Sequence, residues 1–383
     1  IAGDAERITT LNWPADDPLH GADVLLRHAG KTFLAQRADG ACVFLNESNG
    51  RCRIHEQFGG DVKPLGCRLF PFQISATFAG EVSVTARYDC PTVRRNVGAP
   101  HADALPELRR FAQQTGVSSL QSFDDATRCF LDRDQVEAVC EFLGTLMGGF
   151  ARDEQRAMLI ALMCNQLEMM QTDQLERATL AHMYPELKRH IEATTAAPID
   201  RPSAVHRMAF RAVLGMYLRR DEDVLDGRAT RFGRTIAMTK LVLGYGGFGA
   251  LGSSNQPGKL SKAKLFANHQ RFEPRDENTF ALHWRMIHNK LESFQFMGAA
   301  NGGRNFLAGL RSLALLYPLV RAVAQYNAAN RDATQIEPDD VDQAVAAIEH
   351  SFGRSVVLNQ PWARSLERQL VRRDVFVRLA CPV

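Results

Sequence analysis

Four cysteines lie close together near the start of this 383-residue chain, at Cys42, Cys52, Cys67 and Cys90. They are separated by nine, fourteen and twenty-two residues, and each stands beside a glycine, a proline or a turn dipeptide. An unpaired structural cysteine is usually buried among apolar side chains. These four instead occupy polar, turn-rich sequence such as CRIHEQFGGDVKPLGCRLFPF. Any account of this segment has to explain why its cysteines stand in polar, turn-rich sequence.

The sequence around these cysteines predicts short strands and turns. Asp39-Gly40 and Asn49-Gly50 are hairpin-type dipeptides within KTFLAQRADGACVFLNESNGRCRIHE, which we expect to form short strands. Two further strand-like runs flank Ala79-Gly80 in QISATFAGEVSVTARY. A preceding helix in DAERITTLNW, with Asp4 as its N-cap, is expected to stop before Pro14.

From about Pro106 onward the pattern becomes helical. The segments with apolar residues at three- and four-residue spacing are DRDQVEAVCEFLGTLM, DEQRAMLIALMCNQLEMM, QLERATLAHMYPELKRHIEA and SAVHRMAFRAVLGMYLRR. GYGGFGALGSSNQPGKLSKAK is expected to be a long loop, and Pro338 to open a last helix. We therefore predict an α+β, mostly α protein, with a cysteine-rich unit at residues 1–100 and an α-helical domain at residues 101–383.

Composition and charge exclude several classes of protein. The chain is 45% hydrophobic and 23% charged, which is typical of a globular protein, and its net charge of +3 does not indicate a nucleic-acid partner. The most apolar segment, FLAGLRSLALLYPLVRAVA, contains Arg311, Arg321 and Pro318, so we expect a kinked core helix and no membrane span. No signal peptide is visible in a sequence that begins at Ile1, and we expect a cytoplasmic location.

Three explanations for the four cysteines remain open. Two disulfides would require an oxidising compartment, for which the sequence gives no argument. Unrelated buried thiols would not all be expected at turns. A bound metal or cluster fits better, because glycine beside a ligand lets backbone N–H groups approach sulfur, and because Arg53, Lys63 and Arg68 add positive charge that favours thiolate.

The spacing favours a cluster over zinc. Structural zinc sites usually contain close Cys-x-x-Cys pairs, and the visible sequence has none. A proline after a cysteine, as in Cys90-Pro91, also ends the ligand run of bacterial ferredoxins. We therefore expect a [4Fe-4S] cluster, with zinc as the alternative, bound by Cys42, Cys52, Cys67 and Cys90.

The order CVFLNESNGRCRIHEQFG, KPLGCRLFPF and then DCP resembles the YkgJ-type cysteine-cluster family, described as a zinc- or iron-chelating domain. Flagellin lysine N-methylases share a similar arrangement. By this resemblance Cys42, Cys52, Cys67 and Cys90 match the downstream cysteines of the family. Members also carry a tight upstream group of the C-x-x-C-x-x-C-C kind. The sequence from Ile1 has none, so either those ligands lie upstream or these four suffice.

The methylase relatives imply an S-adenosylmethionine-dependent enzyme that acts on protein lysines. The residues themselves leave a second hypothesis open, a non-enzymatic metal-binding or redox module whose helices bind a protein partner. The glycine-rich stretch Gly244–Gly249 satisfies G-x-G-x-x-G, and KLVL before it could form a strand. However, ALGSSNQPGKLS is a poor helix start, so we expect a loop rather than a nucleotide fingerprint.

The remaining candidates have ordinary explanations. His55, three residues from Cys52, is expected to be a partly buried histidine rather than a ligand, and His283 and His288 are five residues apart and so do not share a helix face. Phe70, Pro71 and Phe72 would form an apolar lid over the metal, or part of a core. Three cysteines are expected to pack on apolar helix faces: Cys129, Cys140 and Cys164.

Overall fold

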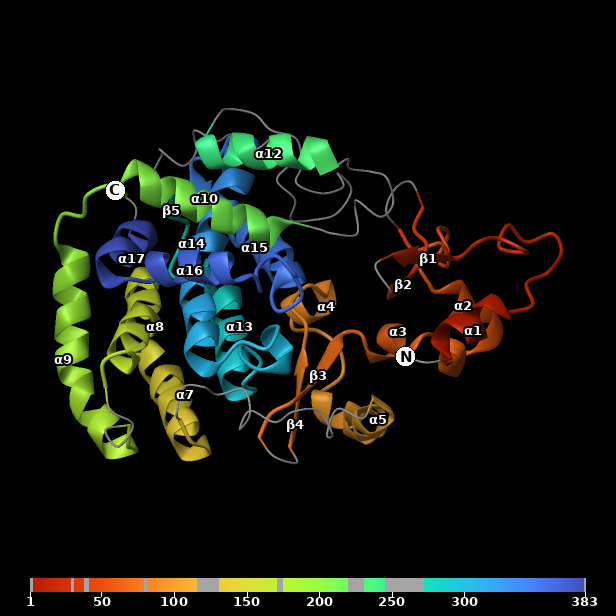
Figure 1. Cartoon of the computed structure of the whole chain (residues 1–383), viewed down its shortest axis with the longest axis horizontal. Helices are drawn as coiled ribbons and strands as arrows, with labels where there is room; N and C mark the ends of the chain where they lie inside the picture. The colour runs from red at the N-terminus through yellow and green to blue at the C-terminus, as the bar shows by residue number, and fades with distance from the viewer. Residues whose placement is uncertain are drawn as a thin grey trace.

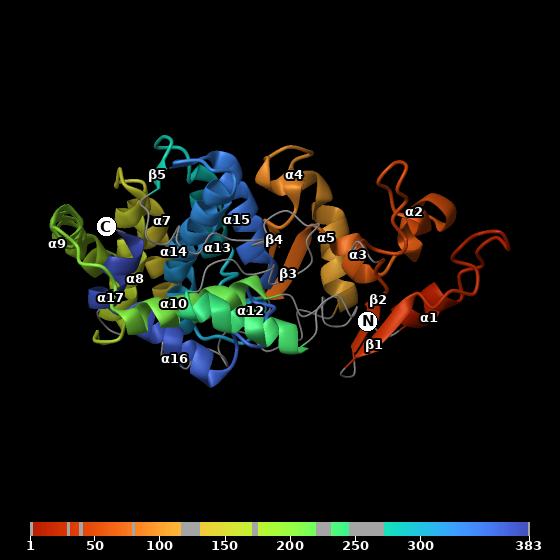
Figure 2. The same ribbon diagram turned by 90° about the horizontal axis from the view of Figure 1, so that it is seen from above.

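The computed structural model of the chain describes residues 3–28, 31–37, 41–78, 81–115, 131–170, 175–219, 231–244 and 272–381. These residues form an α+β, mostly α protein, as the sequence predicts. A small unit with short strands and helices comes first and lies at one side of a larger helical part (Figures 1 and 2). The boundary at residue 100 stays a prediction.

The N-terminal unit is built from short elements. They are α1 (Asp4–Thr9), β1 (Leu25–His28), β2 (Lys31–Leu34), α2 (Arg53–Phe58), the 3-10 turn η1 (Gly60–Val62), α3 (Leu65–Leu69), β3 (Phe72–Ala76), β4 (Val82–Ala86) and α4 (Pro91–Arg94). Strands β1 and β2 pair antiparallel with Leu25 opposite Leu34, and β3 and β4 pair with Phe72 opposite Ala86. The two runs around Ala79-Gly80 are thus confirmed as strands.

Two local predictions for this unit are wrong. The segment from Cys52 was expected to be strand, but Cys52 has extended backbone angles and is the N-cap of α2. Asn46 and Asn49 hold Glu56 of that helix through side-chain hydrogen bonds of 3.2 and 2.7 Å, and these bonds join the predicted turn to the first turn of α2. Asp4 is the first residue of α1 rather than its cap, which is Gly3.

The helical part contains the longer elements. They are α5 (His101–Thr115), α7 (Arg133–Met147), α8 (Asp153–Leu167), α9 (Arg177–Ala196), α10 (Ala204–Leu218), α12 (Arg231–Leu243), α13 (Ala281–Glu292), α14 (Phe306–Asn330), α15 (Pro338–Ser351), α16 (Pro361–Leu370) and α17 (Arg373–Ala380). A 3-10 turn η5 (Ala299–Asn301) lies between α13 and α14, and β5 (Glu273–Pro274) pairs parallel with β6 (Gln335–Ile336). The four helices predicted from spacing are confirmed as α7 to α10. Pro338 opens α15, but α16 and α17 follow, so α15 is not the last helix.

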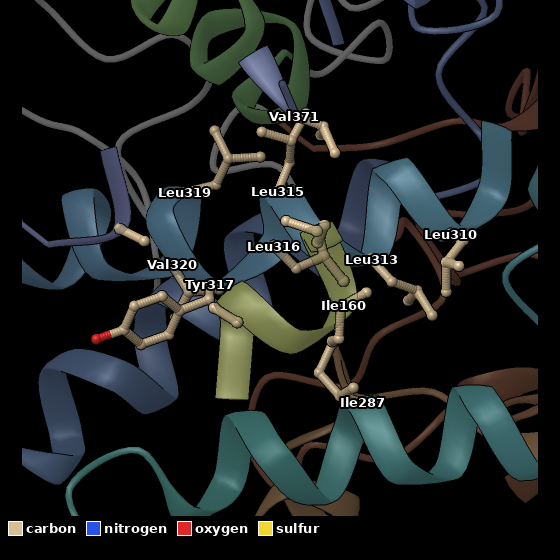
Figure 3. Packing of buried hydrophobic residues seen from close by; sticks show 14 of the residues in the cluster. Ile160, Ile287, Leu310, Leu313, Leu315, Leu316, Tyr317, Leu319, Val320 and Val371 are labelled. Atoms are coloured by element: carbon tan, nitrogen blue, oxygen red, sulfur yellow. The ribbon is translucent and has the colours of Figure 1, made fainter. Parts of the chain in front are cut away.

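Helix α14 is the centre of the main core. Most of its residues are buried from Phe306 to Ala329, and it packs against α8, α13, α15 and α16. Figure 3 shows Leu313 and Leu316 of α14 beside Ile160 of α8, with Ile287 of α13 below. By length and composition α14 is the one described helix apolar enough to cross a membrane, and 83% of its most apolar window is buried within the protein. The predicted core helix is thus confirmed, and it continues through Pro318.

The β3–β4 hairpin connects the two parts. Phe78 and Tyr88 at its ends belong to the main core, whereas Phe72 joins a small separate cluster with Leu65 and Phe111 of α5. Gln295, just after α13, donates from Nε2 to the carbonyls of Gln73 and Ser83. The hairpin is therefore held to the helical part by both apolar packing and hydrogen bonds.

Several sequence predictions fall on residues outside the described ranges. These are the Asp39-Gly40 and Ala79-Gly80 turns, Cys129, and the glycine-rich loop beyond Gly244. The Asn49-Gly50 turn is described and confirmed: the Gly50 N–H donates to the Asn46 carbonyl at 2.8 Å, and Gly50 has a φ of 71°. That left-handed angle explains the glycine.

Candidate metal centre

Cys42 and Cys52 lie beside the small core of the N-terminal unit. Six apolar residues form that core, and Trp13 stacks on Phe44 with ring centroids 5.9 Å apart. Leu45 and Cys52 form an isolated β-bridge, which brings the turn after Cys42 next to the start of α2. The backbone N–H of Phe44 hydrogen-bonds the Cys42 sulfur and lowers its pKa, but desolvation outweighs this and raises the pKa overall. The expected approach of backbone N–H groups to sulfur is confirmed at Cys42.

Cys67 lies in the first turn of α3, and its N–H donates to the Pro64 carbonyl at 2.9 Å. Burial raises the pKa of the Cys67 thiol to about 11, and the nearby thiols of Cys42 and Cys52 raise it further. Lys63 acts in the opposite direction but is outweighed. Lys63 thus favours the thiolate at Cys67 as its charge predicts, but desolvation is the larger effect and keeps the pKa raised.

The other two cations predicted to lie near the thiols, Arg53 and Arg68, each pair with a carboxylate. Arg53 pairs with Asp17 and lies over the Trp13 ring at 5.1 Å from its centroid. Arg68 lies over the Phe111 ring at 4.9 Å and pairs with Asp61 at 3.5 Å. Each of the two guanidinium groups thus pairs with a carboxylate and lies over an aromatic ring.

Cys90 is buried at the N-cap of α4, in a segment that is fixed to the helical part. The Arg94 side chain donates from Nη1 to the carbonyls of Tyr88 and Asp89 and from Nε to Asp342 of α15 at 2.8 Å. Arg285 of α13 donates to the carbonyls of Val93 and Arg94. We call the segment Tyr88–Arg94 the Cys90 joint.

The structure brings three of the four predicted ligands together. Cys42, Cys52 and Cys67 are close enough for each pair to interact electrostatically, while Cys90 is held in the Cys90 joint. All four are free thiols. Within the described ranges, no group of three or more His, Cys, Asp or Glu side chains has an arrangement that could hold a metal ion. By its chemistry the donor set suits a soft metal or a cluster, because it offers three sulfur ligands in the loop-rich unit and a fourth in the Cys90 joint.

The residues around the sulfurs differ partly from expectation. His55 is exposed on α2, not partly buried, and its ring lies next to Gly60. Phe70 is 45% exposed, with Arg87 at 5.4 Å from its ring centroid, while Phe72 packs in the cluster with Phe111. Phe72, one of the three residues of the proposed apolar lid, therefore packs in this small core cluster.

Cys140 and Cys164 are confirmed as packing residues on α7 and α8. Their exposed fractions are 6% and 1%, and burial raises the pKa of both thiols, to about 12 for Cys164. His283 is fully buried between Trp284 and Tyr317, and His288 lies against Gly144. Cys140, Cys164 and His283 are thus buried in the helical part, and His288 is half-buried.

The glycine-rich stretch does not follow a strand. KLVL forms the last turn of helix α12 and not the strand that it could have formed, and Gly244 follows it with a φ of 78°. The strand that a dinucleotide fingerprint requires is therefore missing before this motif.

Arg94 is the residue of this region that the sequence did not reveal. Its side chain is 5% exposed, yet its partner Asp342 is 248 positions away along the chain. The only sequence feature that pointed to Arg94 was its position shortly after Cys90-Pro91. A pair of such separation has no local pattern by which it could be predicted.

Comparison with known families agrees with the position of the thiols. Residues 11–91 match the family model CxxCxxCC, described as "Putative zinc- or iron-chelating domain". No curated protein and no solved structure shows significant similarity to the chain. The matched segment contains Cys42, Cys52, Cys67 and Cys90. Residues 11–91 are thus similar to the cysteine-cluster family of zinc- or iron-chelating domains, which supports a metal-binding cysteine-cluster protein.

Proposed function

We propose that Cys42, Cys52, Cys67 and Cys90 hold a [4Fe-4S] cluster, which would supply electron transfer or a Lewis-acidic iron when bound. The observation that carries the proposal is the grouping of Cys42, Cys52 and Cys67 in one unit. Burial raises the pKa of Cys42 and Cys67; the Cys52 thiol adds to this effect at Cys42, and the Cys42 and Cys52 thiols add to it at Cys67. Metal binding to thiols releases their protons and removes this repulsion. Reduced thiols of this kind fit a cytoplasmic location.

The small core of the unit supports a bound group. Among the described residues of the segment from Ile8 to Ile54, only six apolar residues are buried in this core, which is few for its length. Units with so little apolar burial are commonly stabilised by a metal, and the binding free energy then becomes folding free energy. A cluster at these thiols would join α2, α3 and the turn after Cys42 to the Cys90 joint.

Metal content and colour test the proposal. Full chain purified without oxygen should be brown and contain about four irons per chain. Colourless protein with about one zinc per chain would replace the cluster by a structural zinc site. Cys140→Ala is the matched control, because this cysteine is buried in the helical core, and it should keep the metal content unchanged.

The enzymatic form of the proposal is S-adenosylmethionine-dependent methylation of a protein lysine, as the resemblance to flagellin lysine N-methylases implies. The alternative is a redox or metal-binding module whose helices bind a protein partner. Calorimetry separates them. Heat on titrating S-adenosylmethionine into the metal-loaded chain supports the enzyme, and no heat at millimolar ligand leaves the module.

A further inference from the structure

A second candidate site lies at the end of the molecule away from the cysteine unit. A cavity of about 480 Å³ is formed where the end of α8, the start of α14 and the corner between α16 and α17 meet. In both Figures 1 and 2, α8 and α17 lie on the opposite side of the helical part from α1 and α2. Its volume is in the range of pockets that bind small molecules.

The lining of this cavity is rich in arginine. Its residues are Cys164, Asn165, Glu168, Arg311, Ser365, Arg368, Gln369, Val371 and Arg372. The lining thus contains three guanidinium groups and one carboxylate, a formal net charge of +2. Serine, asparagine and glutamine side chains add neutral hydrogen-bonding groups.

The single carboxylate is shared. Oε1 of Glu168 accepts from Nη2 of Arg311 and lies 3.2 Å from Nε of Arg368. Arg372 pairs instead with Asp374, at 3.5 Å, and Asp374 lies outside the cavity lining. One glutamate therefore orients two of the guanidinium groups but neutralises only one positive charge.

The corner that carries two of these arginines is fixed in place. Nδ2 of Asn165 donates to the Val371 carbonyl at 3.1 Å and to the Ala161 carbonyl of its own helix at 2.6 Å. Val371 is buried, whereas the side chains of Arg368 and Arg372 are 65% and 67% exposed. The backbone is thus held while the two guanidinium groups remain open to solvent and to a ligand.

We propose that this cavity, which we call the arginine pocket, binds a small dianionic molecule through Arg311, Arg368 and Arg372. Guanidinium groups pair with phosphate and carboxylate oxygens through two parallel N–H donors, which gives both affinity and orientation. A phosphorylated ligand and a dicarboxylate share this chemistry. The site is independent of the metal centre, so its ligand would be a substrate or effector of the helical part.

Calorimetry on the full chain tests the proposal with two probes, pyrophosphate and succinate. Binding of either in low salt supports the arginine pocket, and the stronger probe identifies the class of ligand. The double variant Arg368→Gln/Arg372→Gln should weaken binding at least tenfold. Arg275→Gln, at an exposed arginine paired with Asp276 elsewhere, is the matched control and should leave binding unchanged.

Two results would overturn it. One is no binding of either probe at 10 mM, and the other is binding that the double variant leaves intact. Circular dichroism and a melting curve for each variant separate lost binding from lost folding. Because both substituted side chains are mainly exposed, the double variant is expected to melt with the parent chain.

Discussion

Nε of Arg94 donates to Oδ1 of Asp342 at 2.8 Å, and this bond connects the turn after Cys90 to helix α15. The guanidinium is buried, and it also caps the carbonyls of Tyr88 and Asp89. A predicted ligand of the metal centre is therefore positioned by the helical part, not by the unit that holds the other three.

The first prediction concerns this pair. Asp342→Ala should lower the free energy of unfolding by about 1.5–3 kcal/mol, because a buried charged donor loses its acceptor. Asp339→Ala, an exposed acid in the first turn of the same helix, should cost less than about 1 kcal/mol. Urea denaturation of both variants measures the difference. Equal losses would show that the Arg94–Asp342 bond contributes nothing specific.

The second prediction concerns pH and His283. Burial lowers the pKa of this fully buried imidazole to about 3, and neither ring nitrogen has a hydrogen-bond partner within the described residues. The unfolded chain, with a histidine pKa of about 6.5, takes up this proton first as pH falls. His283 therefore makes the fold lose stability from pH 6.5 downward, by up to about 1.4 kcal/mol per pH unit.

Asp153 acts in the opposite sense over part of this range. Burial raises its pKa to about 6, so the folded chain takes up that proton first and gains stability as pH falls toward 4. The comparison of parent and His283→Phe isolates the histidine. The difference in unfolding free energy between the two should shift in favour of the variant between pH 6.5 and 4. A difference that stays constant with pH would contradict the assignment.

The third prediction uses two helical glycines with opposite surroundings. A Cβ on Gly309 of α14 would lie 2.2 Å from the Phe296 carbonyl oxygen, which is backbone and cannot swing away. Gly309→Ala should therefore destabilise by about 1–3 kcal/mol despite the better helix propensity of alanine. On Gly144 of α7 the nearest atom would be Nδ1 of His288 at 3.9 Å. Gly144→Ala should be neutral or stabilise by up to about 1 kcal/mol. Melting curves that rank the two variants the other way would contradict the packing of α14.

The helical part was largely predictable because its information is local. Apolar residues at three- and four-residue spacing located α7 to α10, and the buried face of α14 could be recognised despite Arg311 and Arg321. In the structure Arg321 is buried and pairs with Glu154 of α8, which explains how a core helix tolerates it. An ion pair of this kind leaves no periodic pattern in the sequence, so it could not be predicted.

The cysteine unit was less predictable for the same physical reason. Cys52 was assigned to a strand because the hairpin-type dipeptide Asn49-Gly50 precedes it, whereas hydrogen bonds from Asn46 and Asn49 to Glu56 hold a short helix there. The charge of Lys63 suggested a thiolate at Cys67, but burial decides the pKa. Burial is a property of the folded chain and cannot be predicted from the neighbouring residues in the sequence.

The most direct test of the account is X-ray absorption at the metal edge of the loaded full-length chain, which counts the sulfur atoms bound to the metal. For a [4Fe-4S] cluster the account predicts about four sulfur atoms around each iron at about 2.3 Å, sulfides and cysteine together, in the parent and in Cys140→Ala. Cys90→Ser should lower the number of irons per chain, because one iron loses its cysteine. Iron bound mainly by nitrogen or oxygen, or an iron content that Cys90→Ser leaves unchanged, would contradict a single centre built from these four cysteines.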